Sequence, residues 1–185
     1  KELRQFFPKE GWVEHDPEEI ITSQIAVARQ AVAAIGATAS DVKAVGIANQ
    51  RETTIVWERH SGKPIYPAIV WQDRRTDSFI EELSKAGHNS LFEARTGLVP
   101  NSYFSAPKLV WILDHVSGAR ARALAGDLLF GTVDSWLAFR LSKGALHVTD
   151  ASNASRTMLY NIHSGQWDLD ILETLDIPSV MLPEV

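Results

Sequence analysis

Short segments rich in valine and isoleucine alternate along this sequence with longer segments in which apolar residues recur at helical spacing. The short runs are typical of buried strands, which we expect over 42–48, 53–57, 65–70, 128–130 and 157–160, and as an unpaired strand over 1–7. Helices are predicted from Pro17, behind the capping residue Asp16, to Gly36, and over 76–85, 106–116, 133–142 and 169–175. Residues 149–156 read as a loop. This mixed order favours a layered α/β domain.

Composition narrows the class of protein. The 185 residues are 45% hydrophobic and 22% charged, which suits one folded domain with a sizeable core. A net charge of −5 disfavours binding to nucleic-acid phosphates, and no apolar run approaches the ~20 residues of a membrane-spanning helix. The absence of cysteine excludes disulfides and thiolate metal sites, and it fits a cytoplasmic protein. The chain begins with lysine instead of an initiator methionine, and it ends just after Pro183 without a closing element. We therefore expect a single partial domain over 1–185, truncated at both ends.

Motifs that bind nucleotides or metals are absent. The sequence has no phosphate loop of the form G-x-x-x-x-G-K-[ST], no G-x-G-x-x-G turn and no acidic D-x-G-T turn. The six histidines lack metal-ligand spacing, and we expect them at surface or capping positions. Asp114, Asp134 and Asp150 are candidate carboxylate bases without an evident partner. These residues alone therefore identify no catalytic or metal-binding group.

A polar cluster at Arg51 and Glu52 separates the strands predicted over 42–48 and 53–57. Arginine offers a fork of hydrogen-bond donors, and glutamate offers two acceptor oxygens. Neighbouring residues of a regular strand point to opposite faces, so both can serve one ligand only if the backbone turns or bulges there. The alternative interpretation is a salt-bridged strand end.

Two aromatic residues are candidates for contact with a small polar ligand. Trp71 follows the strand predicted over 65–70 and precedes a strongly polar segment, where it could cover the carbon face of a ligand. Tyr103 lies in a loop before the helix predicted over 106–116 and could donate its hydroxyl group. The alternatives are core packing for Trp71 and a half-buried structural role for Tyr103.

Several stretches match a known family: PKEGWVEHDP (8–17), NQRETTIVW (49–57), GKPIY (62–66), AIVWQ (68–72), RRT (74–76), TGL (96–98), WILD (111–114), LFGTVD (129–134) and residues 149–159. Through these stretches, over essentially its whole length, the sequence resembles the FGGY family of carbohydrate kinases, and most closely the members that phosphorylate glycerol. Of these stretches, QRETT at 50–54 is specific to the glycerol-acting members.

The resemblance implies a ribonuclease-H-like, actin-like α/β domain, with a mixed sheet flanked by helices. It implies transfer of a phosphoryl group from Mg-ATP to glycerol, with glycerol held by Arg51, Glu52, Trp71 and Tyr103. The family's D-x-G-T segment, its catalytic aspartate and its ATP-binding domain have no counterpart in these 185 residues. We therefore expect no catalytic residue here, no tight binding of ATP or Mg²⁺, and no activity from the chain alone.

The implied partners are glycerol and the remainder of a kinase chain, with a homo-oligomer left open. We expect no nucleic acid, no integral membrane contact and a cytoplasmic location. Two alternatives remain: another FGGY kinase, acting on a pentulose or gluconate, and a stand-alone, non-catalytic polyol-binding module. The glycerol-type stretch at 50–54 weighs against the first, and the missing phosphate motifs favour the second.

Overall fold

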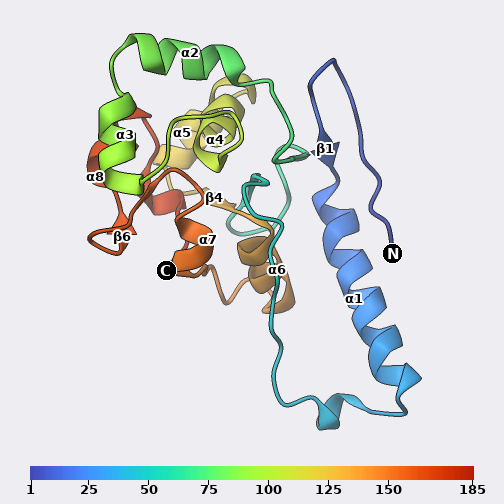
Figure 1. The fold of residues 1–185 in the computed structure, drawn as a ribbon. Helices are drawn as coiled ribbons and strands as arrows, with labels where there is room; N and C mark the ends of the chain where they lie inside the picture. Colours follow the sequence, from blue (N-terminus) through green and yellow to red (C-terminus); the bar gives the residue numbers. More distant parts are fainter.

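All five predicted helices are present in the computed structural model, which describes residues 1–185 (Figure 1). The helices are α1 (Pro17–Ala34), α2 (Asp77–Lys85), α3 (Asn89–Thr96), α4 (Ser105–His115), α5 (Ala119–Leu124), α6 (Val133–Leu141), α7 (Ala151–Ala154) and α8 (Leu169–Thr174), with 3-10 helices η1 (Ala39–Asp41) and η2 (Ser179–Met181). Helices α3 and α5 were not predicted, and α7 lies in the segment expected to be a loop. This single turn forms because the Asp150 side chain accepts a hydrogen bond from the Asn153 amide.

Three two-stranded antiparallel sheets are present in place of the one mixed sheet that we expected. The strands are β1 (Glu14–His15), β2 (Ile55–Glu58), β3 (Ala68–Ile69), β4 (Leu128–Gly131), β5 (Tyr160–Asn161) and β6 (Gln166–Trp167), paired β1–β3, β2–β4 and β5–β6. A single bridge between Thr54 and Ile69 connects the first two pairs. The segment over 1–7 forms only an isolated bridge, between Phe6 and Glu14.

The strand predicted over 42–48 is not formed. After η1 the chain returns to the body as an extended segment, and Val42 and Val45 are 44% and 74% exposed. Residues 43–53 take part in no backbone–backbone hydrogen bond, since no strand lies beside them. A valine-rich composition favours a strand only where a neighbouring strand supplies the hydrogen bonds. In Figure 1 this segment and the C-terminal half of α1 stand away from the body.

The β2–β4 pair separates two hydrophobic cores. Successive side chains of a strand point to opposite faces. Val56 and Phe130, which lie opposite each other, belong to a core of 22 residues that includes α4. Trp57 and Leu129 belong to a second core of 10 residues that includes α6. The pair is therefore buried on both faces, which explains why its sequence is apolar without alternation.

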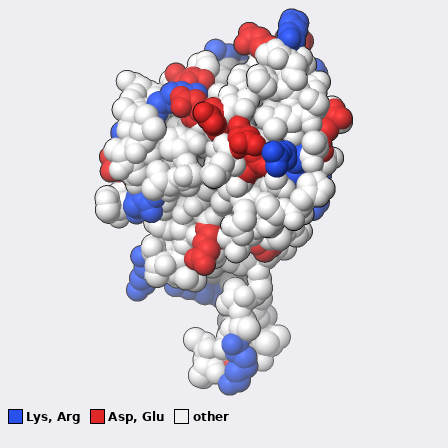
Figure 2. Space-filling view, turned by 90° about the vertical axis from the view of Figure 1, so that its left-hand side faces the viewer, with Lys and Arg blue, Asp and Glu red and all other residues white.

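Charged side chains of both signs are mixed over the face shown in Figure 2. None of the helices is long and apolar enough to span a lipid bilayer.

Candidate functional site

Glu52 lies in a tight turn just before β2, with its backbone in the left-handed region at φ 62°. The chain therefore turns at Arg51 and Glu52, as the sequence required if both were to serve one ligand. The Glu52 side chain is buried, and its Oε1 atom accepts a hydrogen bond of 2.7 Å from Arg156 Nε. No hydrogen bond forms on its Oε2 atom. The ion pair of Glu52 is thus with Arg156, as the alternative of a salt-bridged strand end predicts, although the partner lies outside the polar cluster.

Trp71 and Tyr103 lie against each other, with ring centroids 5.5 Å apart and ring planes at 60°. Trp71 is 38% exposed, so its alternative interpretation as a core residue is wrong. The Arg156 guanidinium lies 5.9 Å from the centre of the Tyr103 ring and links this aromatic pair to Glu52. Three of the four expected residues therefore form one connected group. Arg51 is exposed beside Glu52 and makes no hydrogen bond or ion pair.

Arg156 was not among the expected residues, although it lies within the matching stretch 149–159. It is separated from Glu52 by 104 positions, so no local pattern could have paired the two. Its position depends on the short helix α7, which the sequence did not predict.

A buried ion-pair network fixes the turn that follows Trp71. The Asp73 carboxylate accepts a hydrogen bond of 2.6 Å from the Val13 amide and pairs with Arg75 at 2.8 Å. The same Arg75 pairs with Glu14 at 2.8 Å, and its guanidinium lies 3.8 Å from the centre of the Trp12 ring. Asp73, to which the sequence assigned no role, thus has a structural one.

The three candidate bases are all engaged in structural contacts. Asp114 pairs with Arg120, Asp134 accepts a hydrogen bond of 2.7 Å from the Thr149 hydroxyl, and Asp150 caps α7. The expectation of surface or capping histidines is wrong for His15, which is 4% exposed, and burial lowers its pKa. Neither His15 nor any of the three aspartates forms a hydrogen bond with Glu52 or Tyr103.

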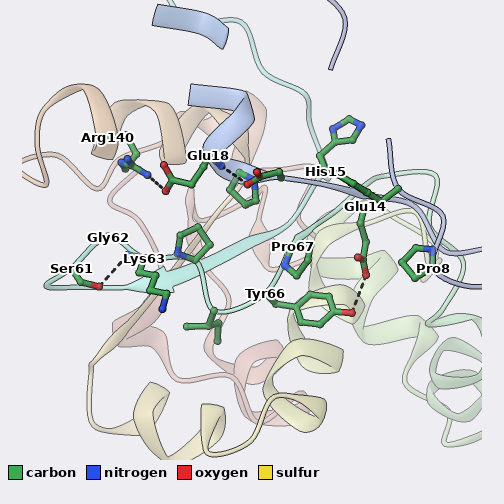
Figure 3. A pocket seen from close by; sticks show the side chains of 15 residues that line it. Pro8, Glu14, His15, Glu18, Ser61, Gly62, Lys63, Tyr66, Pro67 and Arg140 are labelled. Atoms are coloured by element: carbon green, nitrogen blue, oxygen red, sulfur yellow. Dashed lines mark hydrogen bonds and ion pairs between the residues drawn. The ribbon is translucent and has the colours of Figure 1, made fainter. Parts of the chain in front are cut away.

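A cavity of about 400 Å³ lies beside the aromatic pair. It is lined by Trp71, Gln72, Asp73, Arg74, Asp77, Asn101, Ser102 and Tyr103. A larger cavity, about 880 Å³, lies elsewhere, between the β1–α1 segment and residues 61–67 (Figure 3). It contains none of the four expected residues, and its Tyr66 hydroxyl and Arg140 guanidinium are already bonded to Glu14 and Glu18. Of the four expected residues only Trp71 and Tyr103 line the smaller cavity, and Glu52 is joined to them through Arg156. We place the candidate site at Glu52, Trp71 and Tyr103.

The left-handed backbone of Glu52 has a measurable consequence for stability. Glycine adopts this conformation without the clash that a Cβ atom causes, a difference of about 1–2 kcal/mol. We expect Glu52→Gly to be more stable than Glu52→Ala by about 1 kcal/mol in urea unfolding of the chain, since both variants lose the same carboxylate. Equal stability of the two variants would show that this backbone conformation is not maintained in solution.

Comparison with known proteins identifies the family. Residues 1–185 match the N-terminal domain of the FGGY family of carbohydrate kinases. The chain therefore belongs to this family, and it has the fold of that domain, within the actin-like class that we expected.

Among relatives, the chain is 58% identical over 185 residues to the glycerol kinase of Paraburkholderia phytofirmans and 56% identical to that of Deinococcus radiodurans. Each match covers the whole of this chain but only 37% of the relative's length. Among solved structures, Plasmodium falciparum glycerol kinase with ADP shares 36% identity at a TM-score of 0.93, with 37% of that chain covered. A xylulose kinase from Rhodospirillum rubrum shares the fold, with a TM-score of 0.81 at 23% identity. The resemblance to glycerol kinases is thus confirmed.

Proposed function

We propose that this chain supplies the glycerol-binding surface of an ATP-dependent glycerol kinase. The observation that carries the proposal is the connected group of Glu52, Tyr103 and Trp71, with Arg51 adjacent, in a chain 58% identical to glycerol kinases. Within this group the Arg51 guanidinium, the Glu52 Oε2 atom and the Tyr103 hydroxyl have no hydrogen-bond partner in the chain. A ligand with several hydroxyl groups would satisfy them.

Each group suits one part of glycerol. The Arg51 guanidinium can donate hydrogen bonds to two hydroxyl oxygens of glycerol. The Glu52 Oε2 atom can accept a hydrogen bond from a glycerol hydroxyl group. Tyr103 can donate to the remaining hydroxyl, while the partly exposed Trp71 ring can cover the C–H face. A site that pairs every hydroxyl discriminates strongly against an analogue that lacks one, because a buried polar group is then left unpaired.

Phosphoryl transfer would use Mg-ATP, and the residues of this chain do not fit that role. No group of three His, Cys, Asp or Glu side chains in residues 1–185 is arranged to hold a metal ion. We therefore assign ATP and Mg²⁺ to no residue of this chain, and we propose that residues 1–185 alone do not turn over ATP. The part we assign to this chain is to bind and orient glycerol and to exclude water from its carbon face. We propose a cytoplasmic location and one domain over 1–185.

The test uses the full-length protein that carries this chain. Glycerol-dependent formation of ADP is expected to exceed that with xylulose, ribulose or gluconate. Arg51→Ala is expected to lower kcat/KM for glycerol by about 10- to 100-fold, because a charged hydrogen-bond donor is lost. Arg29→Ala, at an exposed position of α1, is the matched control and should have no effect.

Turnover confined to a sugar would assign the chain to another FGGY kinase. Binding of glycerol without turnover by the full-length protein would indicate a polyol-binding module instead. An Arg51→Ala variant with wild-type kcat/KM would overturn the site.

A further inference from the structure

Lys108 is a fully buried lysine in the first turn of α4, with 0% exposure. Its position is unfavourable in two ways. A cation near the N-terminus of a helix opposes the helix dipole, and a buried ammonium group loses its hydration. Burial accordingly lowers its pKa to about 7. Asp73, Glu52 and Asp77 attract it and Arg75 repels it, but Asp73 and Glu52 pair with Arg75 and Arg156 instead. Charge pairing therefore does not explain a lysine at this position.

The Nζ atom of Lys108 donates hydrogen bonds to three successive backbone carbonyls. These belong to Ser102, Tyr103 at 2.8 Å and Phe104 at 2.9 Å. Side chains of a helix lean toward its N-terminus, which brings this lysine under the preceding loop. None of the three carbonyls accepts a hydrogen bond from a backbone amide. The three donors of one ammonium group thus take the place that secondary structure would otherwise fill.

The loop held in this way is the one that carries Tyr103. The Tyr103 amide donates to Asn101 Oδ1 at 2.9 Å, and its carbonyl accepts from Lys108, so its backbone is fixed on both sides. Its ring then packs against Trp71 and Phe104, with centroids 5.5 Å away in both cases. The hydroxyl group is left free to meet a ligand.

From these contacts we propose that Lys108 is a positioning residue for the glycerol subsite, acting by fixing the loop that presents the Tyr103 hydroxyl. This inference rests on the function proposed above. It adds a residue that does not touch the ligand and whose effect must pass through Tyr103.

The test is a double-mutant cycle in the full-length protein. Lys108→Met keeps the length of the side chain and removes the three donors. We expect it to raise the KM for glycerol about tenfold, with kcat changed less than about twofold. In a Tyr103→Phe background the same change should alter KM by less than about twofold, because the hydroxyl that Lys108 positions is gone. Lys85→Met, on the exposed face of α2, is the matched control and should behave as wild type.

Each possible result of the double-mutant cycle either supports or contradicts the proposed role of Lys108. A tenfold rise in KM in both backgrounds would mean that Lys108 acts on the fold in general, and the proposal would be overturned. An unchanged KM for glycerol in the Lys108→Met variant alone would overturn the proposal as well. If Lys108→Met does not fold, Lys108→Gln, which retains two donors, provides the same cycle. Failure of both to fold would make the lysine a determinant of the fold and overturn the proposal. Wild-type activity on glycerol, measured in the same assay, tests the proposed function separately.

Discussion

Replacement of Trp57 by alanine is expected to lower the free energy of unfolding by about 3–5 kcal/mol, as is typical for the loss of a buried tryptophan. Trp57 is fully buried in β2, at the centre of the second core. Its ring centroid lies 5.2 Å from that of Trp136, 5.4 Å from Phe139 and 5.5 Å from His147. Removing the Trp57 ring leaves a cavity that the surrounding side chains cannot fill, because the paired strands β2 and β4 restrict movement of the backbone.

Trp71→Ala is the matched control, since it removes the same side chain from a position that is 38% exposed. Its main loss is one aromatic contact with Tyr103, and we expect a change below about 1.5 kcal/mol. Urea unfolding followed by circular dichroism measures both variants without depending on tryptophan fluorescence. Equal losses for the two would mean that the second core does not form as described.

Glu52→Gln in the full-length protein is expected to reduce kcat/KM for glycerol by about 10- to 100-fold, because charge-assisted hydrogen bonds become neutral ones. The amide keeps the size of the side chain, so packing against Arg156 is largely retained. The variant should also discriminate less between glycerol and propanediols, because the acceptor that recognises one hydroxyl is weakened. Steady-state kinetics with glycerol and both propanediols measure the two effects together.

Glu81→Gln is the control for Glu52→Gln, since Glu81 lies on the exposed face of α2 and pairs only with Lys85 at 3.8 Å. It should leave kcat/KM and the preference among polyols unchanged. A Glu52→Gln variant with wild-type kinetics would place the glycerol site away from Glu52.

The prediction of helices succeeded where local signals were strong. Asp16 and Pro17 define the start of α1 because capping and a preset backbone angle act within a few residues. Helix α3 was missed because it has no capping side chain at its start and a weakly amphipathic sequence. Its end is marked by Gly97, which adopts the left-handed conformation.

The strand predicted over 42–48 shows the limit of local reasoning. Its apolar residues describe a segment that would be buried if paired, but pairing depends on another strand lying beside it. Val45 and Ile47 remain 74% and 37% exposed, since no strand does so in these 185 residues. By contrast, β2 and β4 lie side by side and pair with each other, with one hydrophobic core on each face of the pair.

The sequence by itself determined the family and the five predicted helices, because these depend on a close resemblance and on local patterns. The four glycerol contacts stay a prediction from that resemblance. Only the tertiary structure decided that Arg156 pairs with Glu52, that Trp71 packs against Tyr103 and that Lys108 holds the Tyr103 loop. The first two contacts join residues far apart in the chain, so packing sets them. Lys108 and Tyr103 are only five residues apart in the sequence. Burial of the first turn of α4 nevertheless directs the ammonium group to backbone carbonyls instead of solvent.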